Sequence, residues 1–163
     1  MAHWFDLQPC DGEFFDSAPF RYSYPMYLPV PAEQVWAGLV ADAPLAWCKL
    51  LHNGHYTSER PFGVGTTRSV GVVRGALNLR ERFFRWEEGR RHSFEVVQAS
   101  VPAFKRLAED YLIEDVPTGC RFTWTFAYES GAALGPLGRL TGPPNAAVFN
   151  SLVRDTRRHF GAK

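Results

Sequence analysis

The sequence contains few cysteines and almost no net charge, and both features exclude classes of protein. Cys10, Cys48 and Cys120 are odd in number and lack the spacing of metal ligands, which argues against a disulfide framework and against a structural zinc site. The 18 basic and 17 acidic residues leave a formal net charge of +1, so no global field attracts a polyanion. We therefore expect no bound metal and no nucleic-acid partner.

Long apolar runs and the common cofactor motifs are also missing. The N-terminus has no basic stretch followed by an apolar run, and no segment reaches the roughly eighteen uncharged apolar residues of a membrane span. The segment GVGTT at residues 63–67 lacks the lysine of a phosphate loop, and the chain has no nucleophile-elbow serine and no metal-binding histidine pair on a helix. The sequence thus predicts a cytoplasmic protein without integral membrane contact and without a cofactor.

What the chain does contain is enough apolar and aromatic surface to fold alone. Its 163 residues suit one domain, and 45% of them are hydrophobic. Aromatic residues make up 15% of the chain, and such side chains suit either a rigid core or the lining of an apolar pocket.

Residues 1–19 are predicted to form an accessory arm, separate from a main domain that spans residues 20–163. The arm mixes aromatic residues with proline, glycine and aspartate, which is typical of an irregular segment. Its aromatics can pack onto the body, or they can form an exposed patch that would make the protein a homodimer rather than a monomer. These aromatics are Trp4, Phe5, Phe14 and Phe15.

Turn residues and periodicity predict the order of the elements in the main domain. The aromatic-rich run Phe20–Leu28 is typical of a first strand. Two short helices should follow, over residues 31–40 and 45–51, because prolines open both segments and apolar residues recur at helical spacing in the first. Six further strands are predicted at residues 55–60, 65–73, 76–86, 91–100, 104–115 and 120–129.

The chain should end in a long amphipathic helix over residues 145–160, after a stretch rich in glycine and proline at 131–144. The breaks between the strands are short enough for antiparallel hairpins. We therefore predict an α+β fold in which a seven-stranded antiparallel meander carries the apolar stripe of this helix.

This element order, together with VPAEQVW, GVGTTRSV, RERFFRWEEGRRHSFEV and GCRFTWTF, resembles the SRPBCC superfamily, which includes START-like lipid-binding domains and polyketide cyclase/dehydrase proteins. The resemblance covers residues 20–163 and implies a helix-grip fold, in which a curved sheet wraps around the C-terminal helix. It also implies a cavity between the concave sheet face and that helix. No catalytic signature of the superfamily stands in the sequence.

Strand parity predicts which side chains face this cavity. In the last strand Phe122, Trp124 and Phe126 share one parity and Arg121 and Thr123 the other, so the aromatic row should face the helix. We expect a ligand to contact eleven residues in all: Trp47, Arg68, Glu81, Phe83, Phe94, Val96, Tyr111, Phe122, Trp124, Phe126 and Phe149.

Polar residues on the predicted inner face are the candidates for chemistry. Parity places Glu81 among apolar residues of its strand, and Arg68 lies on the neighbouring strand, so the two can pair inside the cavity or, alternatively, on the outer face. Tyr111 would bring a phenol to the cavity, and Glu109 shares its parity. The candidate catalytic residues are therefore Glu81, Tyr111 and Arg68.

Histidines and cysteines are given no catalytic role. His52 and His55 flank Asn53-Gly54, which suits a rim position, whereas His92 and His159 resemble isolated surface residues. Cys48 would need a base nearby to act as a nucleophile.

The sequence favours a protein that binds a small hydrophobic molecule, such as a lipid, an acyl chain or a polyketide-like aromatic, because apolar residues dominate the predicted interior. The alternative is an enzyme of the polyketide cyclase, aromatase or dehydratase type that acts without a metal through its pocket acids and bases. A protein-interaction role of the outer sheet face has no specific support.

Overall fold

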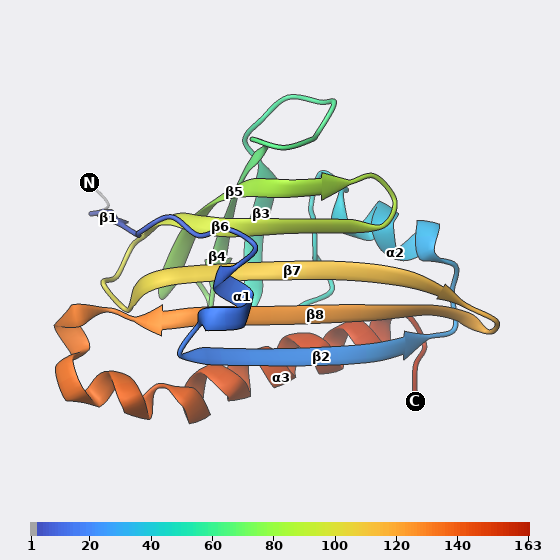
Figure 1. Cartoon of the computed structure of the whole chain (residues 1–163). Helices are drawn as coiled ribbons and strands as arrows, with labels where there is room; N and C mark the ends of the chain where they lie inside the picture. Colours follow the sequence, from blue (N-terminus) through green and yellow to red (C-terminus); the bar gives the residue numbers. More distant parts are fainter. Residues whose placement is uncertain (1–2) are drawn as a thin grey trace.

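A computed structural model describes residues 3–163 as a curved antiparallel sheet that wraps around one long helix (Figure 1). No helix among these residues is both long and apolar enough to cross a membrane. The elements in chain order are β1 (Phe5–Asp6), α1 (Phe14–Ser17), β2 (Phe20–Leu28), α2 (Ala32–Leu39), β3 (Leu51–Tyr56), β4 (Thr67–Val72), β5 (Leu77–Glu87), β6 (Arg91–Ala99), β7 (Phe104–Val116), β8 (Gly119–Ser130), the 3-10 helix η1 (Ala132–Leu140) and α3 (Gly142–His159).

The strands β3 to β8 form an antiparallel meander, and β2 closes the sheet by pairing with β8, so the order is β2-β8-β7-β6-β5-β4-β3. These correspond in order to the seven predicted strands, although β3 begins four residues before the predicted strand at 55–60 and ends at Tyr56, and the α+β helix-grip fold is confirmed. The two-residue strand β1, which the sequence did not predict, pairs with β6.

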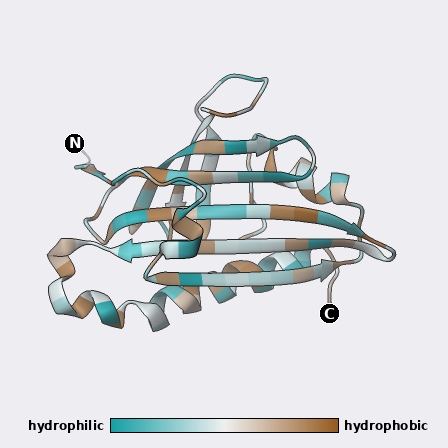
Figure 2. Cartoon of the chain, viewed as in Figure 1, coloured by the Kyte–Doolittle hydropathy of each residue, from teal (hydrophilic) through white to brown (hydrophobic). Residues whose placement is uncertain are grey.

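Alternation of apolar and polar residues places one face of the sheet against α3. Hydrophobic and hydrophilic residues follow each other along the strands (Figure 2). In β8 the rings of Trp124 and Phe126 are buried, and the Phe126 ring stacks on that of Phe149 from α3 with 3.9 Å between centroids. The buried side of α3 also contains Leu152, Val153 and Thr156, so the predicted apolar stripe of the helix lies on the sheet.

The second short helix, predicted over residues 45–51, is absent, and residues 41–50 form turns instead. Leu45 has a φ of 58°, a left-handed conformation that no helical residue adopts. The backbone N–H of Lys49 donates to the Asp155 carboxylate of α3 at 2.9 Å rather than to a helical carbonyl. Contacts with α3 therefore override the local helical preference of this segment.

The N-terminal arm packs on the face of the sheet opposite α3 (Figure 1). Phe14 and Phe15, which lie in α1, are buried against Ala108 and Ala127 of β7 and β8. The predicted packing of the arm on the body is confirmed for these two rings, which are consequently unavailable for an exposed patch.

His92 is fully buried, so its predicted place on the surface is wrong. It shares the inward parity of Phe94 on β6, and its ring lies about 5 Å, between centroids, from four aromatic rings. Neither ring nitrogen has a hydrogen-bond partner among residues 3–163. Burial, with a smaller contribution from the positive charge of Arg68, lowers the pKa of His92 well below its usual value. The four aromatic rings around His92 are those of Trp36, Phe83, Trp86 and Tyr111.

Replacing His92 with phenylalanine should stabilise the protein by about 1–3 kcal/mol at pH 7, because a buried, unpartnered polar ring becomes apolar. The advantage should grow as the pH falls below about 6.5, since His92 takes up a proton only in the unfolded chain and the wild type loses stability there. Urea denaturation at several pH values measures both effects. His55→Phe, at an exposed position, is the control, and a less stable H92F variant at pH 7 would contradict the argument.

Candidate functional site

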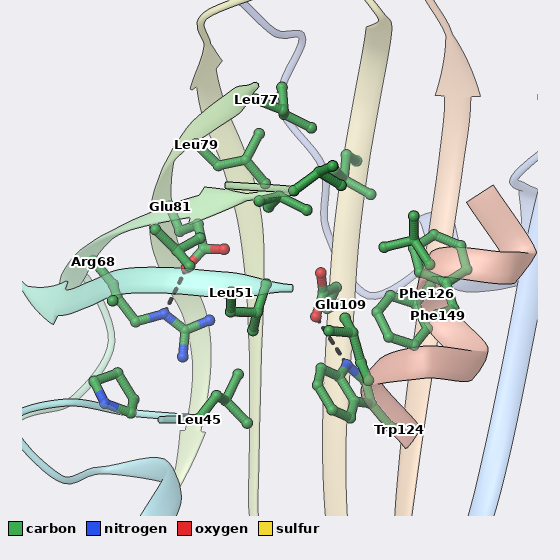
Figure 3. A pocket seen from close by; sticks show the side chains of 18 of the residues that line it. Leu45, Leu51, Arg68, Leu77, Leu79, Glu81, Glu109, Trp124, Phe126 and Phe149 are labelled. Carbon is green, nitrogen blue, oxygen red and sulfur yellow. Dashed lines mark hydrogen bonds and ion pairs between the residues drawn. The ribbon is translucent and has the colours of Figure 1, made fainter. Parts of the chain in front are cut away.

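A cavity of about 160 Å³ lies between the sheet and the N-terminal half of α3. Most of its wall is apolar, and Figure 3 shows side chains from the sheet and from the helix turned toward one another around it. The lining residues are Pro44, Leu45, Leu51, Gly54, Arg68, Val70, Val72, Val73, Leu77, Leu79, Glu81, Phe104, Leu107, Glu109, Tyr111, Trp124, Phe126, Asn145, Val148, Phe149 and Leu152.

Part of the predicted contact set lines this cavity. The residues that do so are Arg68, Glu81, Tyr111, Trp124, Phe126 and Phe149. The structure places these six side chains in the cavity wall, and their contact with a ligand stays a prediction.

The other five predicted contact residues lie outside the cavity wall. Phe83, Phe94, Val96 and Phe122 have the expected inward orientation but are packed in the solid part of the core. The Arg68 guanidinium lies 4.5 Å from the centroid of the Phe94 ring and covers it. Trp47, expected over one end of the cavity, instead stacks on His159 near the C-terminal end of α3 and donates to Thr156 Oγ1 at 2.9 Å.

Sequence reasoning missed much of the aliphatic wall. Val70 and Val72 share the parity of Arg68, and Leu77 and Leu79 share that of Glu81, so strand parity contained the signal for these four residues. Leu45 gave no such signal, because it enters the cavity wall from an irregular turn.

Arg68 and Glu81 form an ion pair inside the protein, not on its outer face. They are direct partners in the β4–β5 ladder, and Arg68 Nε donates to Glu81 Oε2 at 2.5 Å. Both side chains are almost fully buried, with 3% and 2% exposure. Burial raises the pKa of Glu81, and the adjacent guanidinium opposes that shift.

The Arg68 guanidinium keeps unused hydrogen-bonding capacity. Glu81 binds its Nε, whereas Nη1 is buried and has no hydrogen-bond partner among residues 3–163. Figure 3 shows the end of the guanidinium turned away from Glu81. A buried N–H group without an acceptor is costly, so this position is suited to a bound acceptor atom.

Glu109 of β7 is a second buried carboxyl group, and it carries a proton at neutral pH. Burial raises its pKa from an ordinary 4.5 to about 8, helped by the charge of Glu81, while the hydrogen bond from Trp124 opposes the shift. Trp124 Nε1 and the Tyr111 hydroxyl both donate to Oε2, at 2.9 and 3.2 Å. Because Oε2 accepts both bonds, the proton of the acid belongs on Oε1.

The other ionisable groups near the cavity, Tyr111 and Cys48, keep their protons at neutral pH. Burial raises the pKa of Tyr111 well above its usual value, so its phenol stays protonated. Burial also raises the pKa of Cys48 to about 12, which removes a thiolate nucleophile at neutral pH. No three His, Cys, Asp or Glu side chains of residues 3–163 group as metal ligands. The site can therefore donate hydrogen bonds and move a proton at Glu109.

The substitution Glu109→Gln should change how stability depends on pH. The raised pKa stabilises the wild type fully at about pH 4.5 and below, and this contribution is lost as the pH rises through about 8. The loss should be on the order of 5 kcal/mol, because the shift spans about three and a half pK units.

The glutamine variant should lack this loss and be the more stable protein at pH 9. Denaturant titrations between pH 5 and pH 9 measure the difference. Glu59→Gln, at an exposed carboxylate, is the matched control. Parallel pH profiles for the wild type and E109Q would show that Glu109 is ionised in the folded protein.

The fold and sequence match known proteins over most of the chain. A START superfamily protein from Mycobacterium smegmatis superposes with a TM-score of 0.71 at 11% identity, covering 86% of this chain and 97% of that one. The major latex-like protein 151 from Panax ginseng gives 0.62 at 14% identity, covering 86% and 97%. An uncharacterized protein of Mycobacterium tuberculosis is 30% identical in an alignment of 161 positions that covers 96% of this chain and 96% of that one.

A family model described as polyketide cyclase / dehydrase and lipid transport matches residues 20–160. This range contains all the lining residues and starts at the first residue of β2. The chain therefore belongs to the polyketide cyclase / dehydrase and lipid transport family.

Proposed function

We propose that this protein binds one small, mainly apolar molecule in the cavity between the sheet and α3. The observation that carries the proposal is an apolar cavity into which a few buried polar groups project. Apolar walls supply binding free energy through loss of water contact, and convergent polar groups orient the ligand. The family description, which names polyketide cyclases and lipid transport, supports the same class of ligand.

The volume of the cavity limits the size of this ligand. A cavity of about 160 Å³ is close to the ~150 Å³ that holds a benzene molecule, and it is smaller than the ~300–1,000 Å³ of pockets for larger ligands. A single aromatic ring or a short acyl chain therefore fits without rearrangement. A long lipid chain would require the helix to move away from the sheet.

The aromatic part of the wall favours a planar ligand. Trp124, Phe126 and Phe149 line one side of the cavity, and the last two are stacked on each other. Flat rings of this kind present large faces to a flat partner.

Filling the cavity should abolish ligand binding without unfolding the protein. Val70→Phe adds a ring at the β4 wall and should remove the rise in melting temperature that toluene causes in the wild type, since a bound ligand stabilises only the folded state. Val64→Phe, at a position that is 71% exposed, is the matched control and should keep the rise. An unchanged toluene effect in V70F would place the binding site elsewhere.

A second candidate function, catalysis of the cyclase, aromatase or dehydratase type, is favoured by one observation. The Glu109 pKa of about 8 is near the operating pH, which is the condition for an efficient general acid or base. Hydrogen bonds from Arg68 could then polarise a substrate carbonyl while Glu109 transfers the proton. Of the predicted catalytic candidates, Arg68 would polarise the carbonyl, whereas Glu81 would position Arg68 and Tyr111 would donate to Glu109.

If the protein turns over a polyketide-like ketone, the rate should follow one ionisation near pH 8, and Glu109→Gln should reduce kcat by about 100-fold or more because glutamine cannot transfer the proton. Steady-state kinetics between pH 6 and pH 10 tests this expectation, with Glu59→Gln as the control. An E109Q variant with wild-type kcat would remove Glu109 from the mechanism.

A further inference from the structure

We propose that the cavity selects molecules with a neutral carbonyl group, whose oxygen accepts hydrogen bonds from the Arg68 guanidinium and from the Oε1 hydroxyl of Glu109. This inference rests on the proposed function and adds the chemical class of the ligand. The preferred molecule is an aryl or short alkyl ketone, aldehyde or ester of about the size of one aromatic ring.

The first step of the argument is the orientation of the donors. Arg68 Nη1 is buried and has no acceptor within residues 3–163, and it belongs to a guanidinium that lines the cavity. Glu109 also lines the cavity, and its Oε2 is held by Trp124 and Tyr111, which leaves the Oε1 side for a ligand (Figure 3). Two residues with unused donor capacity therefore line one apolar space, and such donors call for an acceptor oxygen.

The second step is the balance of charge. Glu81 already neutralises the charge of Arg68 through a direct ion pair, and Glu109 is uncharged while it holds its proton. A carboxylate ligand would leave one net negative charge in an apolar interior, at a large cost in desolvation. A neutral carbonyl oxygen uses both donors and adds no charge.

The groups around Glu109 decide how the preference responds to pH. The charged or titratable groups that act on it are Arg68 of β4, Glu81 of β5 and Tyr111 of its own strand, and the Cys48 thiol lies close enough to be influenced by it. From α3 the wall receives Asn145 and apolar side chains. Above about pH 8 Glu109 loses its proton, becomes an acceptor and repels a carbonyl oxygen.

The test uses three probes that share one heavy-atom skeleton. Acetophenone carries the neutral carbonyl, α-methylstyrene replaces its oxygen with a methylene group, and benzoate replaces its methyl group with a charged oxygen. Isothermal titration at pH 7 should give acetophenone about tenfold tighter binding than α-methylstyrene, the value of one or two buried hydrogen bonds, and benzoate the weakest binding.

Two variants separate the contributions of the donors. Arg68→Lys keeps a positive charge for Glu81 but removes Nη1, so it should lower the acetophenone preference and leave α-methylstyrene binding unchanged. Glu109→Gln keeps an N–H donor, so it should retain the preference and remove the loss that the wild type shows between pH 7 and pH 9.5. Glu59→Gln should match the wild type throughout.

The outcomes distinguish this inference from the proposed function. Equal binding of acetophenone and α-methylstyrene would overturn the carbonyl preference and leave the apolar cavity site intact. Tighter binding of benzoate than of acetophenone would overturn the charge argument and identify an acid-binding site. Binding of none of the three probes would overturn the proposed function together with this inference.

Discussion

The burial of Arg68 and Glu81 is the interaction on which the interior of this protein depends. The charges of Arg68 and Glu81 are almost completely removed from water, and only their pairing offsets the cost of burying them. Loss of either partner would leave an uncompensated charge in the core. The pair therefore fixes the register of β4 and β5, because a slip of one residue would turn one of the two side chains to the outer face. That register also brings the aliphatic residues of both strands into the cavity wall.

The same pair sets the electrostatic state of its neighbours. Arg68 disfavours a proton on His92, whose aromatic surroundings exclude the charged form, and Glu81 favours the proton on Glu109. The neutral histidine lies among aromatic rings, and the neutral acid lines the cavity. Together Arg68, Glu81, His92 and Glu109 carry no net charge at neutral pH, which is why the hydrogen-bond donors among them can serve an uncharged ligand.

The sequence predicted the fold well because the strands alternate, and alternation determines which face of a sheet a residue occupies. Parity alone placed Arg68 and Glu81 on one face, and the structure shows them paired there. Parity gives the face of the sheet but not the position of a residue along the axis of α3. Phe94 and Val96 therefore point inward as predicted but lie in the packed core, outside the cavity wall. The prediction of the second helix was wrong for a different reason: periodicity does not reveal that Leu45 adopts a left-handed conformation or that the Lys49 N–H donates to Asp155 of α3.

The location of the cavity follows from how large and small side chains are distributed along the sheet. At one end of the grip, rings from α2, β5 and β6 pack against one another around His92 and leave no space. Toward the N-terminal half of α3 the facing residues of β4 and β5 are valine and leucine, whose smaller side chains do not reach Phe126 and Phe149. Ligand size is therefore governed by the aliphatic positions and ligand chemistry by Arg68 and Glu109. Because the two sets occupy different positions, substitution at Val70 or Leu79 can change the volume of the cavity while the ion pair and the acid keep their geometry.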